Sequence, residues 1–310
     1  MKEIIKRATR ESYGIELAKL GEENKSVVVL DADLSAATKT SIFAKTNPDR
    51  FFNMGIAEQD MFSTAAGIST CGNIVFASTF AVFAAGRSYD QIRNSICYPN
   101  LNVKIGATHA GISVGEDGAT HQMIEDMALM RALPNMKVIS PCDDFQTKWA
   151  VQEAAKLNGP VYLRLSRPAV ETIYDETTVF EFGKGIKFGD GEKATVIATG
   201  IAVHEALKAK KMLEGAGIFI RVIDIHTIKP IDKELIIKCA KETEKIITIE
   251  DHSIIGGLGS AVCEVLSENY PKKVVRLGVK DKFGTSGKTD ELMKYYGITY
   301  QDIIEEINRD

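Results

Sequence analysis

The sequence predicts an α/β protein made of two doubly wound domains. Its 310 residues are long for one hydrophobic core, so two domains are expected. Short apolar runs alternate along it with helical patterns, which is typical of parallel sheets covered by helices. The alternation stops once, at residues 168–192, where Thr, Glu, Gly and Lys mix with isolated apolar residues. We therefore expect domains at 1–167 and 193–310, joined by a linker at 168–192 that includes a hairpin turn at 189–191.

The first domain is expected to alternate helices with short strands. Strands are assigned to short apolar runs, and helices to segments whose apolar residues recur every three or four positions. In order, the predicted elements are a helix at 4–23, a strand at 26–30, a short strand that begins at Phe51, a helix at 58–72, a strand at 74–77, a helix at 78–95, a strand at 102–107, a helix at 121–132 with Thr120 as N-cap, a strand at 137–140, a helix at 143–157 and a strand at 161–166.

The second domain is predicted by the same patterns. Strands are expected at 194–199, 218–223, 245–250 and 274–277, helices at 203–214, 232–243 and 258–269, and two short helical runs within 289–309. The glycines of IGGLGSAV follow a predicted strand, but they do not fit the G-x-G-x-x-G register of a dinucleotide site. We interpret them as a tight turn into a helix.

The composition excludes several classes of protein. Apolar residues make up 45% and charged residues 26% of the chain, which is ordinary for a soluble globular protein. The formal net charge of −4, with no Lys/Arg cluster interleaved with aromatic residues, argues against a nucleic-acid binder. Five scattered cysteines without a C-x-x-C pair are typical of a reduced, cytoplasmic chain. The N-terminal residues lack the apolar run of a signal peptide, and no later run is long enough to span a membrane.

The segment 105–126, IGATHAGISVGEDGATHQMIED, is the strongest candidate for a functional loop. It carries His109, Glu116, Asp117 and His121 between two apolar runs, and its glycines let the backbone turn back on itself. These side chains could converge on one small polar ligand, because titratable loop residues beside a strand end are often functional. The alternative is an ordinary connecting loop with solvated acids.

Polar residues at two other strand ends add to this site. Asp31, Asp33 and Ser35 follow the strand at 26–30, at the usual ligand position of an open α/β sheet, although turn and cap roles suit Asp31 and Ser35 equally well. Glu58 begins a helix beside apolar residues. It could favour the helix dipole, or it could keep its proton in an apolar corner and act as an acid catalyst.

The aromatic residues Phe80 and Phe83 are one helical turn apart. Such a pair normally belongs to a core. It would become functional only if a flat ligand lay at the neighbouring strand ends.

The motifs DADLS, GIAEQ, STFAVF, THAGISVGEDGATHQ, LSR and FGTSGKTDEL occur in one order along the chain. In this set and order the chain resembles the C-terminal section of transketolase, with its pyrimidine-binding and C-terminal domains, over essentially all 310 residues. Other thiamine enzymes, such as 1-deoxyxylulose-5-phosphate synthase and the β subunit of 2-oxo acid dehydrogenases, share GIAEQ and the domain pair. The run from His109 to His121 is more similar to transketolase.

The resemblance implies a site for thiamine diphosphate. Glu58 matches the glutamate that shares a proton with N1′ of the aminopyrimidine, which favours the tautomer that removes the thiazolium C2 proton. Phe80 and Phe83 match the aromatic pocket around the pyrimidine, and Asp33 matches an acid beside the cofactor. The third aromatic residue of many transketolases is replaced here by Gly86.

The resemblance also implies a site for a sugar phosphate. Arg10, His109 and Arg167 match the groups that bind its phosphate, a role suited to guanidinium groups. Asp117 matches the carboxylate that recognises a substrate hydroxyl, and His121 matches the imidazole near the transferred ketol unit. Ala37 stands where many transketolases have a phosphate-binding serine.

The diphosphate-binding domain of the family has no counterpart in this sequence. The GDG at 189–191 lies in the linker, and no asparagine follows at a suitable distance to hold a divalent cation. We therefore expect the smaller subunit of a split transketolase, with Mg²⁺ bound mainly by an N-terminal partner subunit and an α2β2 assembly. The alternatives are a subunit of another thiamine enzyme and a non-catalytic partner that scaffolds a complete transketolase.

Overall fold

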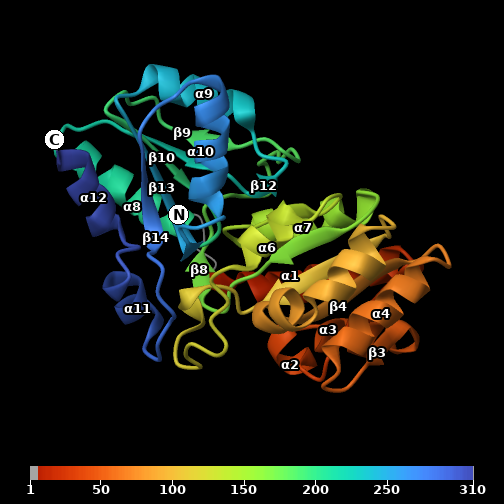
Figure 1. The fold of residues 1–310 in the computed structure, drawn as a ribbon. Coiled ribbons are helices and arrows are strands. Elements are labelled where there is room, and N and C mark those ends of the chain that lie inside the picture. Colours follow the sequence, from red (N-terminus) through yellow and green to blue (C-terminus); the bar gives the residue numbers. More distant parts are fainter. Residues whose placement is uncertain (1–5, 310) are drawn as a thin grey trace.

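The computed structural model describes residues 6–309 and contains two α/β units packed against each other (Figure 1). The sheet of the first unit has the strand order β12-β6-β7-β5-β4-β2-β3, and that of the second has the order β14-β13-β10-β11-β9. Every pairing within these two sheets is parallel except β6 with β12 and β9 with β11. The predicted fold class is confirmed.

The first sheet and its helices come mainly from the first half of the chain. The strands are β2 (Val27–Asp31), β3 (Phe51–Asn53), β4 (Ile74–Phe80), β5 (Val103–Thr108), β6 (Lys137–Ile139), β7 (Val161–Arg164) and β12 (Thr227–Lys229). The helices are α1 (Thr9–Glu23), α2 (Ser35–Thr38), α3 (Ser41–Thr46), α4 (Glu58–Ser69), α5 (Tyr89–Gln91), α6 (Asp126–Ala132) and α7 (Asp144–Lys156), with short 3₁₀ turns η1 (Pro48–Arg50) and η4 (Ile112–Val114) and π-helical segments η2 (Val82–Arg87) and η3 (Ile92–Cys97).

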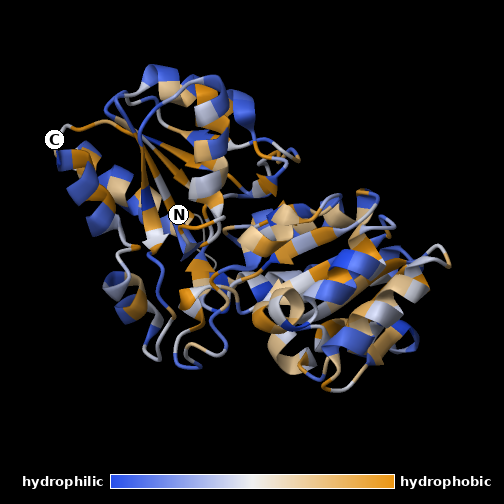
Figure 2. Ribbon diagram, in the orientation of Figure 1, coloured by the Kyte–Doolittle hydropathy of each residue, from blue (hydrophilic) through white to orange (hydrophobic). Residues whose placement is uncertain are grey.

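The second sheet is formed by the later residues. Its strands are β9 (Ile186–Phe188), β10 (Ala194–Ala198), β11 (Arg221–Asp224), β13 (Lys245–Ser253) and β14 (Val274–Val279), and its helices are α8 (Ala202–Gly215), α9 (Lys233–Glu242), α10 (Leu258–Asn269), α11 (Thr289–Tyr295) and α12 (Tyr300–Asn308). Figure 2 shows apolar strands enclosed by helices whose outer faces are polar. Strands β2, β5 and β10 are buried along their whole length, as expected of parallel strands covered on both faces.

Two helices of the first domain begin later in the structure than the sequence predicts. The helix expected at 78–95 begins later, because β4 continues to Phe80 and the residues after it wind partly as π-helix. The helix expected from His121 begins at Asp126. The amide of Gly111 donates to the carbonyl oxygen of Met123 at 2.8 Å, which holds that part of the loop extended. Thr120 contacts His121 Nδ1 at 2.9 Å and caps no helix.

The segment 168–192 contributes a strand to each of two sheets. Strand β8 (Ala169–Glu171) pairs with β1 (Lys6–Ala8), which replaces the start of the helix expected at 4–23; residues 4 and 5 lie outside the described part of the chain. The turn at 189–191 follows β9 and is no hairpin, because β11 lies between β9 and β10 in the sheet. Within residues 6–309, no helix is long and apolar enough to cross a membrane.

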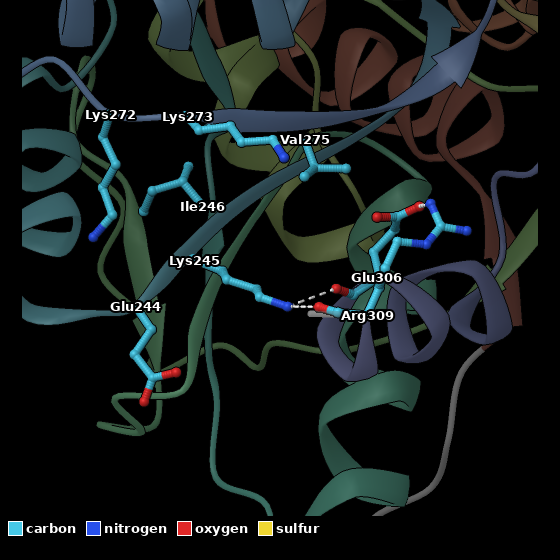
Figure 3. A pocket seen from close by; sticks show the side chains of 8 residues that line it. All are labelled: Glu244, Lys245, Ile246, Lys272, Lys273, Val275, Glu306 and Arg309. Atoms are coloured by element: carbon cyan, nitrogen blue, oxygen red, sulfur yellow. Dashed lines mark hydrogen bonds and ion pairs between the residues drawn. The ribbon is translucent and has the colours of Figure 1, made fainter.

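A hollow lined by several lysines lies where β13 and β14 begin (Figure 3). Two of its lysines, Lys245 and Lys272, have partners within the fold. Lys245 Nζ donates to the carbonyl oxygens of Glu306 and Ile307 at 3.3 and 3.2 Å, and Lys272 Nζ donates to the carbonyl oxygen of Ala240 at 2.7 Å. These ammonium groups stabilise the C-terminal ends of α12 and α9.

Candidate active site

The candidate residues gather at one edge of the first sheet. Strands β7, β5, β4, β2 and β3 are consecutive neighbours and run parallel, so their carboxyl ends meet at this edge. Arg167, His109, Phe80, Asp33 and Glu58 lie at or just after these five ends, in the same order. The carboxyl edge of a parallel sheet is the usual position of a ligand site.

Glu58 is the first residue of α4 and is 2% exposed. The sequence suggested an apolar environment for this carboxylate, but the structure places a cationic side chain beside it. Arg87 Nη1 donates to both carboxylate oxygens, at 3.0 and 2.9 Å, and the guanidinium carbon lies 4.4 Å from the ring centroid of Phe83. Sequence reasoning missed this partner. The one available signal was an arginine at the end of the apolar run STFAVFAAGR.

An aromatic wall stands beside the carboxylate. The rings of Phe80 and Phe83 are stacked with centroids 5.9 Å apart and an interplanar angle of 9°. His121 meets both rings edge-on, at 6.3 and 5.7 Å. A Cβ atom added at Gly86 would approach only Met123 Cε, at 3.9 Å, so the position of the missing third aromatic residue is open space. A flat heteroaromatic ring fits a wall of this kind.

A cluster of nitrogen groups lies on the other side of Phe80. His109 stacks on that ring at 3.8 Å, with Arg10 Nη1 3.3 Å from its Nε2 and Thr108 Oγ1 2.8 Å from its Nδ1. Burial, followed by the charges of Arg10 and Arg167, lowers the pKa of His109 to about 3, so its ring is neutral at physiological pH. Arg10 Nε is buried without a hydrogen-bond partner in the described structure. An anion could supply the acceptor that Arg10 Nε lacks.

The acids of the loop lie farther out than the histidines. Glu116 is exposed, and Arg167 Nη1 donates to its Oε2 at 2.8 Å and to the carbonyl oxygen of Val114. The Arg167 hydrogen bond lowers the pKa of Glu116. Asp117 is also exposed. Burial, followed by the charge of Arg167, lowers the pKa of Arg10, and the charges of Glu11 and Asp117 oppose this only in part. Of the four side chains expected to converge, the two histidines both contact Phe80, whereas the two acids are exposed.

The acids after β2 have different environments. Asp31 is fully buried and accepts hydrogen bonds from the hydroxyls of Thr38 and Thr40, at 2.6 and 2.8 Å, so it is a turn residue. Asp33 is exposed, has a positive φ of 62° and accepts from Asn53 Nδ2 at 3.0 Å. Ser35 begins α2. Of the three, Asp33 is the one that faces the sheet edge as a ligand candidate.

The sequence patterns of two known domains cover most of the chain. The pyrimidine-binding domain of transketolase matches residues 5–172, and the transketolase C-terminal domain matches residues 183–303. The chain belongs to the transketolase family. Along its length it corresponds to the C-terminal section of the thiamine-dependent transketolases.

Several relatives share this section. A provisionally named transketolase C-terminal section from Methanocaldococcus jannaschii is 52% identical over 306 residues, which cover 98% of this chain and 96% of the relative. A 6-deoxy-6-sulfo-D-fructose transketolase subunit from Clostridium sp. (strain MSTE9) is 39% identical, with coverage of 95% and 92%. Transketolase-like protein 2 of Mus musculus is 44% identical across 97% of this chain but only 48% of its own length. The chain thus spans about half the length of such relatives.

Solved structures agree with these relatives. A structure described as a split gene transketolase, an inactive β4 tetramer, superposes with a TM-score of 0.91 at 55% identity and covers 97% of both chains. Transketolase from Leishmania mexicana superposes with a TM-score of 0.82 at 26% identity, covering 97% of this chain and 45% of the other.

Proposed function

We propose that this chain is the smaller subunit of a split transketolase, which moves a two-carbon ketol unit from a ketose phosphate to an aldose phosphate. One observation carries the proposal. A buried carboxylate, an aromatic wall and the cationic groups of Arg10 and Arg167, with Arg10 Nε lacking an acceptor among the described residues, share one sheet edge in a chain that covers only the C-terminal section of its family. The other thiamine enzymes and a purely scaffolding role are less consistent with the retained His109, Asp117 and His121.

The cofactor side would hold the aminopyrimidine of thiamine diphosphate. Phe80 and Phe83 offer a wall for the ring, Glu58 a hydrogen bond to N1′, and Asp33 a carboxylate beside it. When bound, the cofactor supplies an acidic thiazolium carbon that can carry the transferred unit. Glu58 would share a proton with N1′ through one carboxylate oxygen, while Arg87 Nη1, which contacts both oxygens, stabilises the charged form of the carboxylate.

The loop side would hold the substrate. Arg10 and Arg167 would bind its phosphate by charge-assisted hydrogen bonds, and neutral His109 would add one more hydrogen bond. Asp117 at the rim would recognise a sugar hydroxyl. His121 lies against the aromatic wall, where the transferred ketol unit would pass.

The remaining parts of the site belong to a partner in this proposal. An N-terminal subunit with the diphosphate-binding domain would bind the diphosphate and Mg²⁺, in a cytoplasmic α2β2 heterotetramer of the pentose phosphate pathway. The description of the split-gene neighbour, whose β chains alone form an inactive tetramer, supports this arrangement. We also propose that the two domains divide within 168–192, at 1–167 and 193–310.

A sulfonated sugar is a second candidate substrate. The Clostridium relative carries a 6-deoxy-6-sulfo-D-fructose activity in its name. A sulfonate presents three acceptor oxygens, as a phosphate does, and so meets the same donors of Arg10 and Arg167.

The test is ketol transfer by this chain mixed with an N-terminal transketolase subunit that carries GDG and its downstream asparagine. We expect transfer between sugar phosphates and none from either chain alone. Parallel assays with the phosphate and the sulfonate donor would identify the preferred anion. No transfer from either donor by a well-formed complex would contradict the proposal.

A further inference from the structure

The loop 109–122 belongs to the first domain in sequence, yet its backbone is packed into the second. Ile112 in η4 is fully buried, and it shares an apolar cluster with Ile249 of β13 and with Leu292 of α11. Ile124, two residues beyond the loop, lies in the same cluster. The loop therefore enters the core of the second domain between His109 and His121.

One buried carboxylate of the second domain holds the loop backbone. Asp251 of β13 is 1% exposed, and its Oδ1 accepts hydrogen bonds from the amides of Ile112 at 2.7 Å and Ser113 at 3.4 Å. Gly111 makes the approach possible, with a positive φ of 82° and a position at which a Cβ atom would lie 2.3 Å from Asp251 Oδ2. Only glycine satisfies both conditions.

Asp251 is itself held from the first domain. Arg164 Nη2 donates to the carbonyl oxygen of Asp251 at 2.7 Å, and Arg164 Nε donates to Asp126 Oδ2 at 2.9 Å. Asp126 begins the helix α6 that follows the loop, and Tyr162 also donates to it, at 2.9 Å. All of these side chains are buried, so the two ends of the loop are tied to one connected network.

The segment 283–289 holds the rest of the loop. Thr289 Oγ1 donates to the carbonyl oxygen of Ser113 at 3.1 Å, and Gln122 Nε2 donates to the carbonyl oxygen of Thr285 at 2.9 Å. A Cβ atom at Gly118 would lie 2.5 Å from Ser286 Oγ, which shows how closely the two segments pack.

We propose that Asp251 is a positioning residue for substrate binding, through which the second domain fixes the loop that carries His109, Asp117 and His121. This role rests on the proposed function. The second domain thereby acts on the affinity for the sugar substrate, whereas Glu58, Phe80 and Phe83 on the cofactor side are held by α4, β4 and η2 of the first domain. A small displacement of such groups has a large effect on binding and rate, because reactive geometry tolerates little error.

Two variants separate positioning from general stability. Asp251→Ala removes both acceptors from the loop, and Asp251→Asn retains one. The matched control is Glu250→Gln, because Glu250 is the adjacent buried carboxylate and binds two backbone amides of α10, Leu258 at 2.6 Å and Gly259 at 2.8 Å, instead of the loop. A milder variant, Thr289→Val, loosens the loop without removing a buried charge.

In the assembled enzyme we expect Asp251→Ala to raise KM for the sugar phosphate about tenfold or more, with cofactor affinity unchanged. Asp251→Asn should lie between Asp251→Ala and the wild type, Thr289→Val should raise KM by a smaller factor, and Glu250→Gln should leave KM at the wild-type value. Unchanged KM in both Asp251→Asn and Thr289→Val, or an equal rise in Glu250→Gln, would overturn the proposal.

Hydrogen exchange in the chain alone gives a second readout that does not depend on activity. Peptides covering 116–122 should exchange about tenfold faster in Asp251→Ala than in the wild type and at the wild-type rate in Glu250→Gln. Equal protection of these peptides in all three proteins would overturn the proposal. If the wild-type complex transfers no ketol unit, the proposed function fails, and loop exchange still decides whether Asp251 holds the loop.

Discussion

The two halves of the sheet edge are built in different ways. On the cofactor side, Glu58 and Arg87 are 29 positions apart and lie in the same domain. On the loop side, Asp251 and Ile112 are 139 positions apart and come from different domains. The cofactor side is thus a local structure, whereas the loop side depends on how the domains pack.

The cofactor side and the loop side also differ in the partners that their charged groups already have. Glu58 is already paired with Arg87, so a ligand there shares the carboxylate with a guanidinium group. Arg10 lies beside neutral His109, and its Nε is buried without an acceptor among the described residues, so an anion adds a contact at Arg10, whereas at Arg167 it replaces Glu116. We therefore expect substitutions on the cofactor side to affect the chemical step, and those on the loop side to affect substrate affinity.

The largest effect is expected from Glu58→Gln. The amide keeps a hydrogen bond to the cofactor but cannot share a proton with N1′, so exchange of the cofactor's C2 proton in the assembled enzyme should slow by about a hundredfold or more. Asp60→Asn is a matched control, because Asp60 is exposed in the same helical turn. Exchange of the C2 proton at the wild-type rate in Glu58→Gln would refute the role assigned to this carboxylate.

The next effect is expected from Arg167→Ala and His109→Ala. Each substitution removes a hydrogen-bonding group from the phosphate site, and the loss of one charge-assisted contact costs about 1.5–3 kcal/mol. KM for phosphorylated sugars should therefore rise roughly ten- to a hundredfold for Arg167→Ala and by less for His109→Ala, whose ring is neutral. Unphosphorylated analogues serve as the control. An equal loss on both kinds of substrate would show that these residues do not recognise phosphate.

The sequence predicted the local parts of this comparison and missed the distant ones. The main parallel strands of both sheets, and the polar residues that follow them, are indicated by short apolar runs and the residues that end them, whereas the short strands β8, β9 and β12 were not predicted. The predicted start of α6, at His121, was wrong because the hydrogen bond between Gly111 and Met123 holds the residues after Thr120 out of the helix. The roles of Arg87 and Asp251 depend on tertiary contacts that leave no local pattern.

A smaller effect concerns pH and His109. Burial lowers the pKa of His109 from 6.5 to about 3. Between pH 6.5 and pH 3 the folded chain therefore binds fewer protons at this residue than the unfolded chain does. The free energy of unfolding consequently falls as the pH drops through this range. In His109→Gln, the fall in unfolding free energy between pH 7 and pH 5 should shrink by roughly 1–2 kcal/mol. Urea unfolding of the chain at both pH values measures it. Identical falls in the two proteins would contradict the buried, neutral ring.

The smallest effect is expected from Arg87→Gln in the chain alone. Glu58 would keep a weaker, neutral partner, and the free energy of unfolding should decrease by roughly 1 kcal/mol, since Arg87 is half-exposed. Arg93→Gln is the control, because Arg93 is exposed and donates to the neighbouring Asn94. Equal stability of the two variants would mean that the ion pair contributes nothing to the folded chain.

Calorimetry with thiamine diphosphate and Mg²⁺ tests most directly whether this chain holds half of a shared site. The proposal assigns the pyrimidine to the aromatic wall and Glu58, and it assigns to the partner the oxygen ligands and glycine-rich turn that the diphosphate and its cation need. We predict no tight binding by the chain alone and micromolar binding once the N-terminal subunit is added. Micromolar binding together with ketol transfer by the isolated chain would contradict the account.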